Sequence, residues 1–272
     1  MPALAGCGSD DALSPEAVAE AADKTASKGS VRVAIKQTIT LQGGSPIQTS
    51  GEGVVDPKSR RGRLKSDLSG IPGRPNDIGS GSQEIIFDGF TMYMRSPLFA
   101  GALPAGKTWL KIDVNKAGKA AGIDLGALAQ QGQDPTEALR YLKAASGDVE
   151  RVGEEDVRGT KTTRYKATID FKRYPDLVPA KDRAAVRRSI EQIIKLSGAE
   201  KAPMEVWIGE DGVVRRLRQR INTVIATGMR STADQQIELY DFGVSVAVQP
   251  PPAGDTQDAT DLATEGMRRL TE

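Results

Sequence analysis

Two residue types that carry much of enzyme and metal chemistry are missing or nearly missing from this sequence. It contains no histidine and a single cysteine, Cys7, among 272 residues. Without histidine there is no Ser-His-Asp or Cys-His catalysis and no imidazole ligand for zinc. One cysteine can form neither an intrachain disulfide nor a thiolate metal site. The sequence therefore predicts no metal and no cofactor.

Acid-base catalysis by carboxylates is the enzyme hypothesis that this composition leaves open. Its candidates are pairs such as Glu154 and Asp156, which lie in a polar segment rich in turns. Solvation is expected there, and it keeps carboxylates near their ordinary pKa values. We therefore predict that the protein is not an enzyme.

Long hydrophobic runs and excess charge are also lacking. No stretch approaches the roughly 18 apolar residues of a membrane-spanning helix. Lys and Arg number 37 and Asp and Glu 36, for a net charge of +1, whereas nucleic-acid-binding domains are usually strongly basic. These features predict a soluble body and no nucleic-acid partner.

The single cysteine lies in a short motif, Leu4-Ala5-Gly6-Cys7. A leucine three positions before a cysteine, with two small residues between, is typical of the site at which bacterial lipoproteins are cleaved and acylated. Residues 8–12 would then be a polar tether. A signal peptide needs a charged start and an apolar stretch of roughly 7–15 residues, which Met1-Pro2-Ala3 does not supply. A lone cysteine near a frayed terminus is the alternative.

Hydrophobic periodicity predicts a chain of strands interrupted by helices. Ser14-Pro15-Glu16 indicates a helix start that continues to Gly29. Further helices are expected at residues 134–147, behind a capping box, and 182–197, with a short one at 262–270. The expected strands cover residues 30–41, 51–56, 61–68, 83–87, 91–95, 107–114, 149–153, 163–171, 204–208, 213–221 and 235–248.

The order of these elements predicts an α+β fold. Successive hairpins with turns at Asp88-Gly89 and Asp211-Gly212 favour one antiparallel sheet, and amphipathic helices need its concave face to bury their apolar stripes. We expect a highly curved antiparallel sheet with helices packed on its concave side. Residues 1–13 are interpreted as lipobox and tether, 14–253 as the folded domain and 254–272 as a polar C-terminal tail.

A series of segments in this order resembles the actinobacterial LppX/LprA/LprF/LprG lipoproteins, relatives of the LolA-like half-barrel family. The resemblance extends from about residue 14 to residue 253, beyond the lipobox-like start, and the tail after Pro252 departs from it. The segments are Phe87-Asp88-Gly89-Phe90-Thr91-Met92-Tyr93, Lys107-Thr108-Trp109, Asp134-Pro135, residues 152–165, Trp207-Ile208-Gly209-Glu210-Asp211-Gly212 and Tyr240-Asp241-Phe242-Gly243.

The resemblance implies a half-barrel that encloses an apolar cavity for acyl chains. It implies a lipoprotein anchored through lipidated Cys7 to the outer face of the cell membrane, where it carries an acylated lipid or lipoglycan across the cell envelope without catalysis. A membrane transporter is a further implied partner. The alternative is an envelope lipoprotein that acts as a protein-binding or regulatory module for a transporter or a signalling partner.

The candidate liners of such a cavity are large apolar side chains on the expected strands and helices. An apolar stripe at strand or helix spacing is ordinarily core, and that alternative stays open for each of them. They are Phe87, Met92, Met94, Trp109, Ile112, Leu139, Leu142, Val186, Ile190, Ile193, Ile194 and Leu217.

Two further groups are candidates for the entrance and for headgroup binding. Leu98, Phe99 and Leu103 lie in an apolar segment rich in Pro and Gly, which would line the cavity mouth or else plug a sheet end. Arg216, Arg218 and Arg220 share a strand face that would bind anionic lipid headgroups. The alternative is a solvated face on which Arg218 pairs with Glu205 and Arg216 stacks on Trp207.

Overall fold

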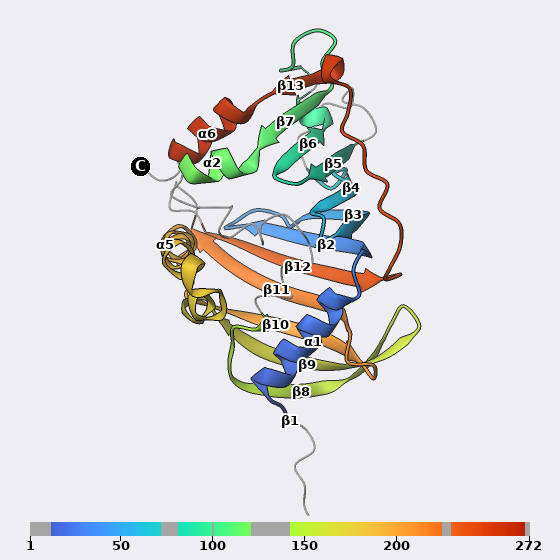
Figure 1. The fold of residues 1–272 in the computed structure, drawn as a ribbon, viewed down its shortest axis with the longest axis vertical. Helices are drawn as coiled ribbons and strands as arrows, with labels where there is room; N and C mark the ends of the chain where they lie inside the picture. Colours follow the sequence, from blue (N-terminus) through green and yellow to red (C-terminus); the bar gives the residue numbers. More distant parts are fainter. Residues whose placement is uncertain (1–11, 72–80, 100, 121–141, 225–229, 270–272) are drawn as a thin grey trace, which may run out of the picture.

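The computed structural model describes residues 12–71, 81–99, 101–120, 142–224 and 230–269. Within them the strands form a single sheet of 13 members in the order β1-β8-β9-β10-β11-β12-β2-β3-β4-β5-β6-β7-β13. Neighbouring strands are antiparallel, except that β13 is parallel to β7. The sheet is strongly curved and does not close, as the sequence predicted (Figure 1).

The strands follow the predicted pattern closely in the first part of the chain. Their bounds are Ala12–Leu13 (β1), Val31–Leu41 (β2), Ile47–Asp56 (β3), Arg61–Asp67 (β4), Ser82–Asp88 (β5), Thr91–Arg95 (β6), Trp109–Asp113 (β7), Ala145–Val157 (β8), Thr160–Asp170 (β9), Lys201–Gly209 (β10), Val214–Val224 (β11), Arg230–Tyr240 (β12) and Thr256–Asp258 (β13). The helices are α1 (Pro15–Ser27), α2 (Val114–Ala120), α5 (Ala180–Ser197) and α6 (Thr260–Arg269), with 3₁₀ turns η1 (Pro97–Phe99), η3 (Phe171–Leu177) and η4 (Ala253–Asp255).

Helix α1 begins as its sequence predicts and lies across the inner face of β8 and β11 (Figure 1). The Ser14 side chain accepts a hydrogen bond from the Ala17 amide at 3.2 Å, and Pro15 takes the first helical position. Near the other end, the Thr25 hydroxyl donates to the Ala21 carbonyl at 2.6 Å and accepts from the Val214 amide at 2.9 Å. This buried threonine fixes the helix to the start of β11.

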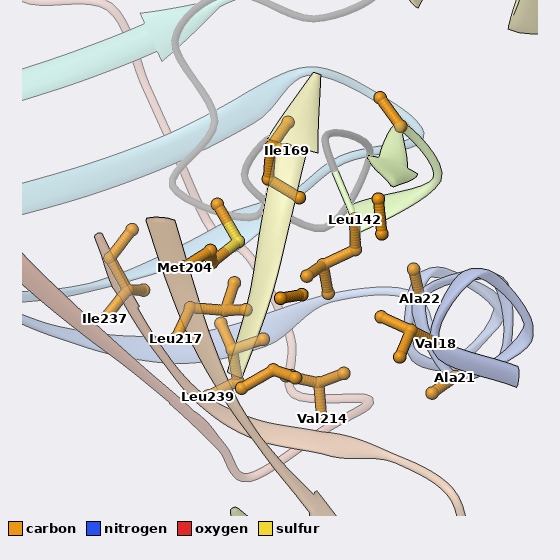
Figure 2. Packing of buried hydrophobic residues seen from close by; sticks show 14 of the residues in the cluster. Val18, Ala21, Ala22, Leu142, Ile169, Met204, Val214, Leu217, Ile237 and Leu239 are labelled. Carbon is orange, nitrogen blue, oxygen red and sulfur yellow. The ribbon is translucent and has the colours of Figure 1, made fainter. Parts of the chain in front are cut away.

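The main core fills the concave side of the sheet between the strands and two helices. Figure 2 shows Val18, Ala21 and Ala22 of α1 facing side chains from β9 to β12. Helix α5 contributes Val186 and Ile190 to the same cluster. Because each antiparallel strand presents alternate residues to this side, one continuous apolar face is buried beneath the helices.

The last long strand is shorter than predicted. It ends at Tyr240, not at Val248, because Asp241 and Gly243 adopt positive φ angles of 49° and 78° that turn the chain away. The Gly243 amide then donates to the Ser30 carbonyl at 2.7 Å. The apolar alternation continues to Val248 for another reason, since Val246 and Val248 pack against Ile86 and Trp109.

The C-terminal segment was expected to be a polar tail, and this expectation needs correction. Residues 256–258 form β13 beside β7, and the Thr108 amide donates to the Asp255 carbonyl at 2.9 Å. The expected short helix is present as α6, which packs against α2. Hydrogen bonds from Thr260 and an ion pair with Lys111 lower the pKa of Asp258 to about 2. The segment is therefore joined to the sheet at its far edge.

The helix expected at residues 134–147 falls largely outside the described residues. Its capping box and Leu139 lie in the range 121–141, which is not described. Its expected end is wrong, because β8 already begins at Ala145.

Replacing Thr25 with valine tests the attachment of α1. The change keeps the shape of the side chain but leaves the buried Val214 amide without a partner, which we expect to lower the free energy of unfolding by about 1–3 kcal/mol. Urea denaturation measures this loss. Thr25→Ser is the control because it keeps the hydroxyl, so it should cost less than Thr25→Val. Equal stability of wild type and Thr25→Val would contradict the role of the bond.

Candidate functional site

The inner faces of β5, β6 and β7 carry two rows of apolar side chains. Phe87 lies opposite Met92, which lies opposite Ile112, and the next row runs from Ile85 through Met94 to Leu110. Residues directly opposite each other point to the same face of a sheet. Ile85 and Phe87 pack against the main core, so both rows point to the concave side. All six residues are half-buried.

This arrangement brings together four of the predicted cavity liners, Phe87, Met92, Met94 and Ile112. It adds Ile85 and Leu110, which sequence reasoning did not select. The signal that identifies them is the two-residue spacing of Ile85 and Phe87 and of Leu110 and Ile112.

Four of the other described liners are buried in the main core. Leu142, Val186, Ile190 and Leu217 are at most 2% exposed. Ile193 and Ile194 are half-buried and pack against the same cluster. The interior therefore has a densely packed half beneath α1 and α5 and a less covered half along β5 to β7.

Trp109 does not lie with the other liners. It is on β7 at odd spacing from Leu110 and Ile112, so its side chain points to the outer face. There it is 7% exposed and packs with Ile86 and Val248, while the Arg95 guanidinium lies 4.9 Å from its ring centre. The structure thus places Trp109 beneath the C-terminal segment rather than inside the half-barrel.

The predicted mouth residues lie in the connection between β6 and β7. Leu98 on η1 is 49% exposed, whereas Phe99 and Leu103 are half-buried. The Phe99 carbonyl accepts from the amides of Ala102 and Leu103, which makes a compact turn. Their role at an entrance stays a prediction.

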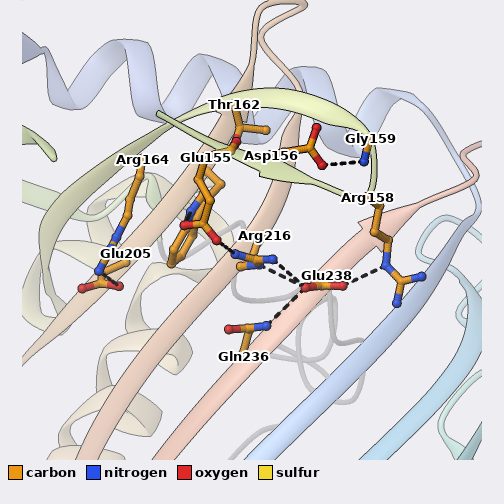
Figure 3. A network of polar contacts seen from close by, with 11 residues as sticks. Glu155, Asp156, Arg158, Gly159, Thr162, Arg164, Glu205, Arg216, Gln236 and Glu238 are labelled. Atoms are coloured by element: carbon orange, nitrogen blue, oxygen red, sulfur yellow. Dashed lines mark hydrogen bonds and ion pairs between the residues drawn. The ribbon is translucent and has the colours of Figure 1, made fainter. Parts of the chain in front are cut away.

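The three predicted headgroup arginines form ion pairs on the outer face of β11, and Figure 3 shows the network around Arg216. Arg216 pairs with Glu155 and with Glu238, the latter at 2.9 Å, and its guanidinium lies 5.1 Å from the Trp207 ring centre. Arg218 binds Asp234 through two hydrogen bonds of 2.9 and 2.8 Å, and Arg220 shares that carboxylate at 3.0 Å. The stacking of Arg216 on Trp207 is confirmed.

The predicted ion pair of Glu205 with Arg218 is wrong, although the two residues do lie opposite each other. Glu205 pairs with Arg164 of β9 at 2.8 Å. Arg218 turns to Asp234 on β12 instead. A strand inside a sheet has two neighbours, and the hairpin turn in the sequence identifies one of them.

The carboxylates of this network are held in their charged form. A hydrogen bond from the Trp207 indole lowers the pKa of Glu155, and hydrogen bonds from Arg216 add to it. Burial raises the pKa of Glu238, but bonds from Arg158 and Arg216 outweigh it and leave the pKa below its ordinary value. The bond from Arg218 lowers the pKa of Asp234. Groups of this kind are poor proton donors at neutral pH.

Two open polar grooves run over the same outer face. One of about 410 Å³ is bordered by Lys36, Arg218, Arg220 and Asp234 among other polar residues of β2, β11 and β12. The other, of about 610 Å³, lies over β2 to β4 and includes Lys65, Arg158 and Glu238. Both are lined mainly by polar and charged side chains.

The described residues offer neither a metal-binding cluster nor a membrane-spanning helix. No cluster of three or more Cys, Asp or Glu side chains there could hold a metal ion. No helix in the same part of the chain is long and apolar enough to cross a membrane.

Replacing Glu238 with glutamine tests the outer network. The change removes the carboxylate that Arg158 and Arg216 share. We therefore expect the free energy of unfolding, measured by urea denaturation at pH 7, to fall by about 1–3 kcal/mol. The pKa of Glu238 is lower in the folded than in the unfolded protein. Its ion pairs therefore stabilise the fold at pH values above the ordinary carboxyl pKa of 4.5, and this stabilisation is lost as the pH falls below 4.5.

The pH dependence distinguishes this effect from a simple packing defect. The difference in the free energy of unfolding between wild type and Glu238→Gln should shrink in acid, where Glu238 becomes protonated. Glu154→Gln, at an exposed ion pair, is the matched control and should cost less than 1 kcal/mol. A difference that stays constant from pH 7 to pH 3 would contradict the assigned role.

Comparison with known proteins gives two curated relatives from Streptomyces. No protein-family model matches the chain. An uncharacterized 31.2 kDa protein from the rplA-rplJ intergenic region of Streptomyces griseus is 26% identical over 163 residues, which is 59% of this chain and 51% of that protein. A Streptomyces coelicolor protein named "Putative lipoprotein" is 26% identical over 167 residues, 59% of this chain and 46% of that protein. The chain thus spans about half the length of the curated relatives it matches.

Among solved structures, the chain is similar to the lipoprotein LppX of Mycobacterium tuberculosis. The TM-score is 0.51 at 15% sequence identity, over 87% of this chain and 100% of that chain. At this identity the likeness concerns the fold. The resemblance predicted from the sequence is therefore confirmed at that level: the chain has the curved, open, antiparallel-rich fold of the LppX-type lipoproteins.

Proposed function

We propose that this protein binds the acyl chains of a lipid or lipoglycan on the inner face of its half-barrel and carries them across the cell envelope. The observation that supports the proposal most directly is the half-buried apolar surface of β5 to β7. A densely packed core would bury such residues fully. Apolar side chains that stay partly accessible on a concave face are suited to hold an apolar ligand.

The chemistry of this surface suits acyl chains of varied shape. Met92 and Met94 lie side by side along β6 on the inner face, next to Phe87 and Ile112. Methionine side chains are flexible and polarizable, so they adapt to different ligands. No charged residue belongs to the two rows.

The energetics of such a surface fit carriage. Each buried methylene contributes about 0.8 kcal/mol, so a C16 chain such as palmitate gains on the order of 12 kcal/mol on leaving water. Transfer from a bilayer is nearly neutral, because the bilayer interior is also apolar. A carrier with this balance takes up a lipid from a membrane and releases it again.

Anchoring is a second part of the proposal. The motif Leu4-Ala5-Gly6-Cys7 supports acylation of Cys7 and a location at the outer face of the cell membrane, and the name of the Streptomyces coelicolor relative agrees with it. Cys7 lies outside the described residues. The polar residues that follow it would tether the folded body to the membrane.

A binding role without catalysis agrees with the state of the carboxylates. Glu155, Asp234 and Glu238 are held ionised by arginines and by Trp207. Glu154 is paired with Arg151 and Lys161. These contacts stabilise the outer face, and the lowered pKa values of Glu155, Asp234 and Glu238 leave those three groups unsuited to general acid catalysis.

Native mass spectrometry of the purified chain tests lipid binding. We expect discrete adducts with the mass of lipids, carried over from the expressing cells. A clean mass of the protein alone in several preparations, and after incubation with phospholipid vesicles, would contradict the proposal. That result would favour the protein-binding alternative.

Filling the inner face should remove the adducts. Met94→Trp enlarges a half-buried residue in the middle of the apolar rows, so we expect a several-fold lower fraction of lipid-bound protein with the far-ultraviolet circular dichroism unchanged. Met94→Leu is the matched control, because it keeps the volume and should bind as wild type does. Equal binding by a folded Met94→Trp variant would exclude this surface as the lipid site.

A further inference from the structure

Several segments of this nearly neutral chain are basic, among them residues 58–65 and 215–220, and the segment of η3 and α5 is another. Residues 171–198, which form η3 and α5, contain seven basic and three acidic side chains, for a net charge of +4. The whole chain carries +1, so the remaining residues sum to −3. A segment with excess positive charge attracts anionic partners.

The two faces of α5 differ sharply. Val186 and Ile190 are buried in the main core, at 0% and 2% exposure. Arg188 and Lys195 lie on the opposite side of the helix and are exposed. Within the part of the chain that the structure describes, neither of them forms an ion pair, although Glu191 lies between them on the same side. Their charges are therefore available to a partner.

An exposed apolar side chain adjoins this basic face. Leu177 ends η3, which packs against α5, and it is 44% exposed. Arg183 and Arg187 lie nearby and share Asp176, at 4.0 and 3.6 Å. Basic side chains around an exposed leucine are typical of surfaces that rest on an anionic bilayer.

The other exposed leucines lack this charge. Leu262 on α6 is 76% exposed, but the helix carries two acidic and two basic residues. Leu98 on η1 is not flanked by a basic helix. The combination of unpaired cations and an exposed leucine thus favours α5 and η3.

We propose that the outer face of α5, with Leu177, is the surface by which the folded body docks onto an anionic membrane. The site is distinct from the acyl anchor and does not require the lipid-binding surface. The inner side of α5 packs into the main core through Val186 and Ile190, whereas the proposed acyl surface lies along β5 to β7.

Vesicle flotation tests the proposal directly. The chain is used with Cys7→Ser in every sample, so that no acyl anchor contributes. We expect binding to vesicles of phosphatidylcholine with about one third phosphatidylglycerol, little binding to phosphatidylcholine alone, and release at about 1 M salt, where the Debye length is roughly 3 Å. Equal binding to both vesicles, or binding to neither, would overturn the proposal.

Charge-matched variants locate the surface. Arg188→Ala with Lys195→Ala removes two cations from α5 and should weaken binding on the order of 25-fold, or about five-fold for each cation. Lys36→Ala with Arg220→Ala removes two cations from the outer groove and should leave binding unchanged. Loss of binding in the groove variant alone, or equal loss in both, would contradict docking through α5.

The apolar contribution has its own variant. Leu177→Asn removes an exposed side chain, so the fold should be unaffected while binding to anionic vesicles falls. Circular dichroism and the urea midpoint verify folding for all variants. Native mass spectrometry of the α5 variants separates this proposal from the lipid-binding one: lipid adducts should persist in them, and their loss together with docking would mean that α5 acts on the interior instead.

Discussion

The alternation of side chains along an antiparallel strand is the constraint on which this structure depends. Each strand presents one set of residues to the concave side and the other set to the convex side. On β11, Leu217 enters the core while Arg216 and Arg218 join the outer network. On β6, Met92 and Met94 point inward while Tyr93 packs outside. A single sheet thereby separates an apolar interior from an ion-paired exterior.

The two halves of the sheet are completed in different ways. Helices α1 and α5 bury the inner face along β8 to β12, with residues such as Val18 and Ile190 almost inaccessible. Along β5 to β7 the inner rows stay half-buried, and the C-terminal segment covers the outer face instead (Figure 1). That segment leaves β12 in the middle of the sheet and pairs with β7 near its edge. It thus connects the centre of the curved sheet to its rim.

The ion pairs on the outer face have a structural role. Glu238 and Arg216 are 13% and 14% exposed, so each depends on the other to offset the cost of lost hydration. Asp234 likewise holds Arg218 and Arg220. These pairs join neighbouring strands on the outer face of the sheet.

Much of the fold could be predicted because its signals are local. The cap at Ser14, the turn residues Gly89 and Gly212, and two-residue periodicity identified the first helix and most strands. The need to bury amphipathic helices predicted the curvature of the sheet, and the family resemblance supplied its open half-barrel form. The pairing of Trp207 with Arg216 followed from the turn between β10 and β11.

One failure could have been avoided from local pattern, and the others arose where tertiary contacts decide. Trp109 and Ile112 are three residues apart on one strand, so they cannot share a face, and their spacing alone could have separated them. The partner of Glu205 depends on which second strand lies beside β10. The end of β12 was missed because Val246 and Val248 keep an apolar alternation that serves the outer cluster.

The central claim, that acyl chains lie on the inner rows of β5 to β7, can be tested by mapping where a bound lipid reacts. A fatty acid with a diazirine near its methyl end is photo-crosslinked to the protein, and the modified residues are identified by peptide mass spectrometry. The account predicts modification at Met92, Met94, Leu110 and Ile112, with Tyr93 and Lys111 between them unmodified. Labels on Tyr93 and Lys111, or labels spread without alternation, would contradict it.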